Sequence, residues 1–84
     1  MPEKYRNTKL ATKEYRTLSQ IKGPLIFVER VAGVAFDEMV QIIDPDGILR
    51  VGRVLEIDGD MAIIQMFLGT EGLDISRTGV RFSG

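Results

Sequence analysis

Two turn sequences constrain what this chain can fold into more than any other feature. Asp-Pro-Asp-Gly at residues 44–47 and Asp-Gly at residues 58–59 each lie between runs of apolar and β-branched residues. Proline presets φ at the first central position of a turn, and glycine accepts the left-handed backbone with which such turns often end. Apolar runs joined in this way are typical of β-hairpins. We therefore predict two hairpins, which join residues 40–43 to 48–51 and residues 54–57 to 61–67.

The N-terminal half of the chain contains two more strand candidates. Strand-forming residues lie at 15–21, and a compact apolar run follows at 25–28. Gly23-Pro24, between them, marks a kink, a bulge or a break between two strands, because proline cannot donate in a strand ladder.

In the C-terminal half, one glycine and one long loop interrupt the strand pattern. Gly52, inside the middle strand, predicts a bulge or a tight bend. Residues 69–79 contain three glycines and predict a loop, and residues 80–82 predict a last short strand. About six short strands separated by turns are typical of an all-β domain. We expect a small closed six-stranded barrel, because closing the sheet removes its unpaired edges.

Charged residues are unevenly distributed along the 84-residue chain, whose formal net charge is −1. Residues 1–22 carry six basic and two acidic side chains, whereas residues 23–84 carry five and ten. Residues 1–13 show no clean period, so we expect a flexible basic N-terminal arm in front of a β-barrel domain at 14–84. A basic arm steers an acidic partner toward the domain more than it adds affinity.

Missing residue types and motifs narrow the possible functions. The sequence has no cysteine and no histidine, which excludes disulfides, thiolate metal sites and the usual base near neutral pH. Neither standard glycine-rich nucleotide motif occurs, and no apolar run is long enough to span a membrane. The acidic body argues against nucleic acid. We therefore expect no catalytic residue, no cofactor, no metal, no nucleic-acid partner and no direct membrane insertion.

Acidic residues are clustered at 44–46 and at 56–60, and each cluster is a candidate site for a bound cation. A calcium loop of the EF-hand type that began at Asp44 needs a bidentate glutamate at its twelfth position, and Leu55 stands there. Both groups belong to predicted hairpin tips, so we interpret them as turn residues.

Three longer segments carry a more specific signal. They are Gly-Pro-Leu-Ile-Phe-Val-Glu at 23–29, Phe-Leu-Gly-Thr-Glu-Gly-Leu-Asp at 67–74 and Thr-Gly-Val-Arg-Phe-Ser-Gly at 78–84. In order and spacing they resemble the N-terminal domain of the B-type subunit, the non-catalytic head subunit of archaeal and bacterial V-type ATP synthases. The resemblance covers residues 14–84. One departure is Leu68, where the family usually has glutamate, so the contact made by that glutamate should be absent.

The resemblance implies a six-stranded β-barrel with a structural role and no catalysis of its own. In the family, such barrels stand side by side around the top of the hexameric head and hold the alternating A-type and B-type subunits together. The same region of the B-type subunit is similar to the docking place for the peripheral stalk, made of subunits E and G (also called H). The complex translocates protons or sodium ions, which implies a peripheral location on the cytoplasmic side of the cell membrane. Nucleotide is bound by the following domain, so we expect residues 14–84 to be a fragment of a longer chain.

For the protein interface we predict five residues on the face or rim of the barrel: Tyr15, Arg16, Phe36, Met39 and Leu68. An alternative from another class stays open, namely a free-standing small β-barrel that binds a ligand or an oligonucleotide. A reading frame that continues into a nucleotide-binding domain would separate the two hypotheses.

Overall fold

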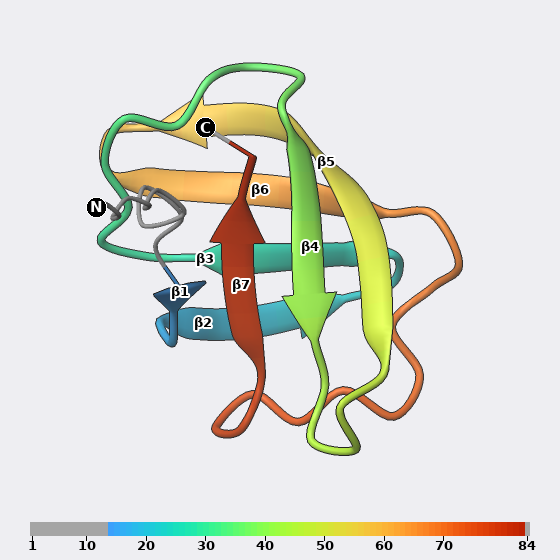
Figure 1. The fold of residues 1–84 in the computed structure, drawn as a ribbon. Helices are drawn as coiled ribbons and strands as arrows, with labels where there is room; N and C mark the ends of the chain where they lie inside the picture. The colour runs from blue at the N-terminus through green and yellow to red at the C-terminus, as the bar shows by residue number, and fades with distance from the viewer. Residues whose placement is uncertain (1–13, 84) are drawn as a thin grey trace, which may run out of the picture.

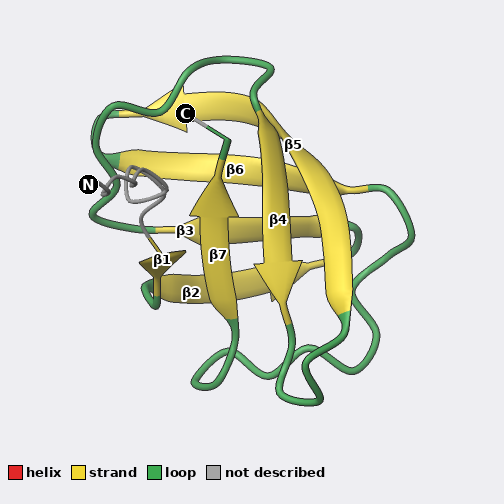
Figure 2. Cartoon of the chain, in the orientation of Figure 1, coloured by secondary structure: helices red, strands yellow, loops and turns green. Residues whose placement is uncertain are grey.

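Seven β-strands make up the part of the chain that the computed structural model describes, residues 14–83 (Figure 1). They form one antiparallel sheet in the order β1-β7-β4-β5-β6-β3-β2. No helix occurs in this range, which confirms the all-β prediction (Figure 2). The predicted arm at 1–13 lies outside the described residues. The strands are β1 (Glu14–Tyr15), β2 (Leu18–Lys22), β3 (Leu25–Val28), β4 (Met39–Ile43), β5 (Leu49–Asp58), β6 (Met61–Met66) and β7 (Gly79–Phe82).

The sheet curls into two layers that share the long strand β5. In Figure 1, β4 and β7 run upright in front of β2, β3 and β6, which run across behind them. The first half of β5 pairs with β4, and its second half pairs only with β6. A bulge between Val54 and Glu56 lies where β5 bends from one layer into the other. Bulges increase the local twist of a strand, so this one helps the sheet to curl.

The sheet remains open, so the prediction of a closed six-stranded barrel is wrong in two respects. There are seven strands, and the two edge strands β1 and β2 do not pair with each other. The predicted strand at 15–21 is divided at Arg16 and Thr17. Its first part pairs with β7 and its second with β3, so one predicted strand supplies both edges of a curled half-barrel.

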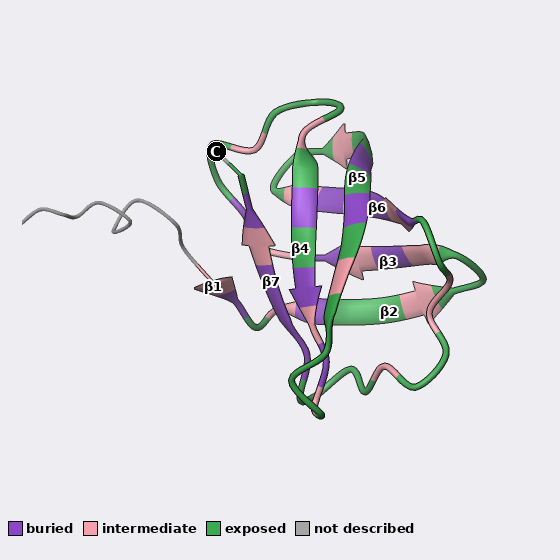
Figure 3. Ribbon diagram, turned by 45° about the vertical axis from the view of Figure 1, so that its right-hand side comes forward, coloured by how far each residue is buried: buried purple, intermediate pink, exposed green. Residues whose placement is uncertain are grey.

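Buried residues lie on strands of both layers (Figure 3), and their side chains form one hydrophobic core. Inward positions alternate with outward ones along each strand, as the period of two in a strand requires. Near the open edge, the rings of Tyr15 and Phe82 meet edge to face, with 5.6 Å between their centroids. Fully buried aliphatic side chains come from both layers: Val40, Ile42 and Val80 from the front, and Ile26, Val28 and Ile64 from the back.

The structure confirms both predicted hairpins. β4 and β5 are joined through the turn at 44–47, and β5 and β6 through Asp58-Gly59. Gly23-Pro24 is the turn between β2 and β3, which decides among the alternatives left open there.

Gly52 differs from its prediction. The bulge of β5 lies between Val54 and Glu56, and Gly52 itself pairs in register with Val40 and Met66. A Cβ atom at Gly52 would lie 2.8 Å from the backbone oxygen of Gln65, so glycine is needed here for close strand packing.

Candidate functional site

Five apolar side chains are exposed around one groove at the end of the barrel where β5 begins. Three of these side chains belong to the β4–β5 connection and to β5, and the other two belong to the residues that come directly after β6 in the chain. The groove encloses about 670 Å³ and is also lined by Arg50 and Glu71. We refer to it as the apolar groove; its apolar side chains are Ile48, Leu49, Val51, Phe67 and Leu68.

The strand register inverts the usual polarity at this end of the sheet. Arg50 pairs with the buried Ile42, so both side chains belong to the inner face. Leu49 pairs with Ile43, and Val51 pairs with Gln41, on the outer face. The charged residue therefore points inward, while the apolar residues Leu49 and Val51 point to the outside.

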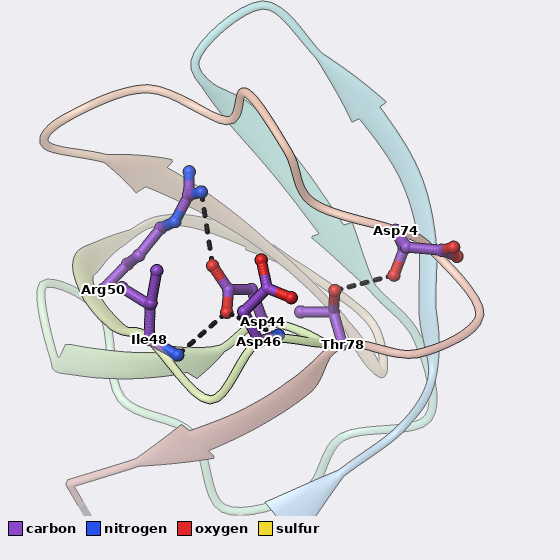
Figure 4. A network of polar contacts seen from close by, with 6 residues as sticks. All are labelled: Asp44, Asp46, Ile48, Arg50, Asp74 and Thr78. Atoms are coloured by element: carbon purple, nitrogen blue, oxygen red, sulfur yellow. Dashed lines mark hydrogen bonds and ion pairs between the residues drawn. The ribbon is translucent and has the colours of Figure 1, made fainter.

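The inward charge is compensated by Asp44, whose side chain is almost fully buried (Figure 4). An Arg50 guanidinium nitrogen lies 3.3 Å from one carboxylate oxygen of Asp44. The other oxygen accepts hydrogen bonds from the backbone N–H groups of Asp46 (3.1 Å) and Ile48 (2.9 Å). One carboxylate thus fixes the turn and the start of β5, so the groove wall that carries Ile48 is held in place.

The opposite side of the groove continues into the loop at 69–78, which has its own polar anchor. The Thr78 hydroxyl is buried and donates to the Asp74 backbone oxygen at 2.6 Å (Figure 4). Hydrogen bonds from the hydroxyl and the backbone N–H of Ser76 lower the pKa of the Asp74 carboxyl below its usual value, and the nearby Arg77 adds to this. The loop is therefore locally ordered by its own side chains.

Arg53 links the groove to the neighbouring surface. Its guanidinium carbon lies 5.9 Å from the Phe67 ring centroid, a cation–π distance, and its Nε lies 3.1 Å from an Asp37 carboxylate oxygen. Across β4, a smaller hollow of about 350 Å³ contains Met39 and Arg81 and shares Val51 with the groove. The two hollows therefore form one partly apolar surface over the outer face of β4 and β5.

The five predicted interface residues fall in five different places, four of them on the surface. Leu68 is 93% exposed and lines the apolar groove, and Met39 lines the smaller hollow. Phe36 is 71% exposed in the loop between β3 and β4. Arg16 is exposed between the two edge strands and forms an ion pair with Glu14 at 2.9 Å.

Tyr15 is placed in the core instead of on the surface. Its side chain is only 8% exposed. Its hydroxyl donates to the Ala32 backbone oxygen and accepts from the Ala32 N–H, both at 3.3 Å. The structure thus brings Leu68 and Met39 to adjoining hollows and leaves Phe36, Arg16 and Tyr15 apart from them.

Sequence reasoning missed four groove residues: Ile48, Leu49, Val51 and Phe67. All four lie in predicted strands, where an apolar side chain is ordinarily expected to face the core. One feature of the sequence could have identified them, namely an acidic residue and an arginine on either side of the turn, at Asp44 and Arg50. If these two pair on the inner face of the sheet, the apolar residues next to Arg50 must lie on the outer face.

The described part of the chain contains neither a metal-binding cluster nor a membrane-spanning helix. Within residues 14–83, no group of three or more acidic side chains is arranged to hold a metal ion. In the same range, no helix exists that could cross a lipid bilayer.

A comparison with known protein families identifies the fold family of this chain. The family model of the ATP synthase alpha/beta family, β-barrel domain, matches residues 18–84. The match begins with β2 and includes six of the seven strands. Because it spans most of the chain, the protein belongs to the ATP synthase alpha/beta family, whose β-barrel domain it contains.

Proposed function

We propose that this chain is the N-terminal barrel domain of the non-catalytic B-type subunit of a V-type ATP synthase. It holds the alternating ring of A-type and B-type subunits together and receives the peripheral stalk formed by subunits E and G (or H). The family supports membership of a multi-subunit ATP synthase and a structural assembly role. The resemblance of the segments at 23–29, 67–74 and 78–84 to the B-type subunit supports the finer assignment.

The single observation that carries the proposal is the inverted polarity at the start of β5. A small domain buries only a limited apolar area, so apolar side chains are expected to face its core. In this domain Leu49 and Val51 face outward, while Arg50 faces inward. Contiguous exposed apolar side chains mark an interaction surface, and membership of a multi-subunit ATP synthase family supports a protein as the partner. The surface over β4 and β5 is therefore proposed as the contact face within the assembly.

A ring position also requires a second contact face. In a closed ring, each member meets its two neighbours through different surfaces. Phe36, with its 71% exposed ring, lies in the loop at the other end of β4 from the groove and is the candidate for this second face. Arg16 and the basic segment 1–13 are proposed to orient the stalk.

The domain is proposed to contribute no catalysis and to bind no cofactor. The buried Asp44 carboxylate already accepts a hydrogen bond from the Ile48 N–H in its turn and forms an ion pair with Arg50. Asp74 is committed to Ser76. The intact complex would couple proton or sodium translocation to ATP, with this domain on its cytoplasmic periphery.

A calorimetric titration tests the proposal. The chain is titrated with the catalytic A-type subunit and with an E–G heterodimer, and magnesium–ATP is titrated in parallel. We expect saturable binding of the protein partners and no heat of binding from ATP. Leu68→Ser should weaken binding of the A-type subunit, whereas Ile75→Ser, a matched change of an exposed residue outside the groove, should not. Saturable ATP binding, or no binding of either protein, would refute the assignment.

A further inference from the structure

We propose that the apolar groove receives a short apolar segment of a partner protein that carries a lysine or arginine. The groove gives this partner two features to recognise, namely apolar walls and a carboxylate at the rim. This proposal adds the chemistry of the partner to the proposed assembly role. It rests on that role only in assuming that this face contacts a protein.

The apolar part of the binding energy comes from side chains on both segments that line the groove. Ile48, Leu49 and Val51 come from the β4–β5 connection and β5, whereas Phe67 and Leu68 follow β6. The two segments meet where the Phe67 N–H donates to the Val51 backbone oxygen at 3.2 Å. Each of these side chains is more than one third exposed. A partner segment that places apolar side chains between the walls removes this surface from water, and this burial supplies the affinity.

The charge of the partner follows from which ions at the groove are already paired. Arg50 is paired with Asp44 at 3.3 Å, and Arg53 is paired with Asp37 at 3.1 Å. Glu71 lines the groove and forms no ion pair with any residue of the described part. The charge that remains for a partner is therefore negative, and a basic residue on the partner complements it.

The groove is preformed. Asp44 fixes the wall that carries Ile48, and Arg50 approaches the opposite loop, since a Cβ at Gly72 would lie 3.3 Å from its guanidinium nitrogen. The Thr70 hydroxyl also donates to the Gly23 backbone oxygen at 2.7 Å, which fixes that loop to the β2–β3 turn. Two walls held by separate polar anchors lose little freedom when a partner binds.

Synthetic peptides test the proposal on the whole chain. The first probe is an amphipathic peptide of about 14 residues with leucines at i, i+3, i+4 and i+7 and two flanking lysines. The second is identical except that glutamine replaces both lysines. Each peptide is titrated into isotope-labelled chain at low salt, and amide NMR shifts report the location and the affinity. We expect saturable shifts at residues 48–51 and 67–71.

Two matched variants separate the charge from the apolar contribution. Glu71→Gln should weaken the lysine peptide about two- to fivefold, as expected for an exposed ion pair, and leave the glutamine peptide unchanged. Glu56→Gln, which removes an exposed acid on the distal half of β5, should change neither. Leu68→Ser should weaken both peptides.

Several results would overturn the inference. They are equal loss in the Glu71→Gln and Glu56→Gln variants, shifts located away from the groove, and no saturable binding of either peptide. Concentration-dependent shifts of the same amides without peptide would identify a second copy of the chain as the occupant instead. Peptide binding is measured without any other component of the ATP synthase, so its failure is distinguishable from failure of the proposed ATP synthase assignment.

Discussion

Replacing Gly52 by alanine should destabilise the domain, although glycine is normally the weaker strand residue. A Cβ at this position would lie 2.8 Å from the Gln65 backbone oxygen, 2.9 Å from Cγ2 of Ile64 and 3.0 Å from Sδ of Met66. The Gln65 backbone has little room to withdraw, because β6 pairs with β5 on one side and with β3 on the other. The strain must therefore spread through the centre of the sheet.

The size of the effect follows from two opposing contributions. Overpacking of a well-packed site costs about 1–3 kcal/mol. Alanine also restricts the unfolded chain, which returns about 0.4–1 kcal/mol. We expect Gly52→Ala to lower the free energy of unfolding by about 1–2 kcal/mol net. For a domain of this size, that corresponds to a fall in Tm of roughly 4–16 °C.

Gly79→Ala is the matched control. A Cβ at Gly79 would also be crowded, but its neighbour is the carboxylate of Glu14, the end of a flexible side chain that can swing aside. Urea and thermal unfolding of both variants and the wild type should show a clear loss for Gly52→Ala and little change for Gly79→Ala. Equal stability of the Gly52 variant and the wild type, or a larger loss at Gly79, would refute the packing argument.

Three further changes test the polar anchors. Asp44→Ala should lower the free energy of unfolding by about 1–3 kcal/mol, because it leaves two N–H donors of the turn and Arg50 without their acceptor; urea unfolding measures this, and an unchanged midpoint would contradict it. Tyr15→Phe should cost about 1 kcal/mol by the same assay, because the hydroxyl bonds to Ala32 are lost. The pKa of Asp74 is lowered by folding, so its stabilising contribution is present at neutral pH and is lost as pH falls below about 4. Ser76→Ala removes the hydroxyl and keeps the backbone N–H, so it should raise that pKa part of the way toward the usual value in an NMR titration. An unchanged value would show that the Ser76 hydroxyl is not a cause.

The strands next to strong turn sequences could be predicted from the chain alone. Proline and glycine at 44–47 and glycine at 59 determine local backbone geometry, and local geometry is what sequence patterns report. The closure of the sheet could not be predicted in this way. Whether β1 and β2 pair depends on the break at Arg16 and Thr17 and on contacts with strands far away in the sequence.

The candidate site was harder to predict, because it depends on which face of each strand points outward. A shift of one residue exchanges the two faces of a strand. Tyr15 is predicted on the face or rim and is buried, whereas Val51, in a predicted strand, is exposed and lines the groove. The bulge in β5 has a similar effect, because Leu55 and Glu56 are both exposed in succession, which strict alternation does not allow.

The pair Asp44 and Arg50 explains why the exposed apolar surface lies at this end of the barrel. If the chain were selected only to fold alone, the inward position of Arg50 would be better filled by an aliphatic residue, and the outward positions of Leu49 and Val51 by polar ones. Such an exchange would remove both the inward ion pair, in which Asp44 is buried and Arg50 is partly buried, and the exposure of two apolar side chains. The opposite arrangement is reasonable when a partner covers the outer face, because the inward ion pair then serves to hold the turn and the groove in shape. Polar replacements at Leu49 and Val51 should therefore leave the free energy of unfolding nearly unchanged and weaken partner binding.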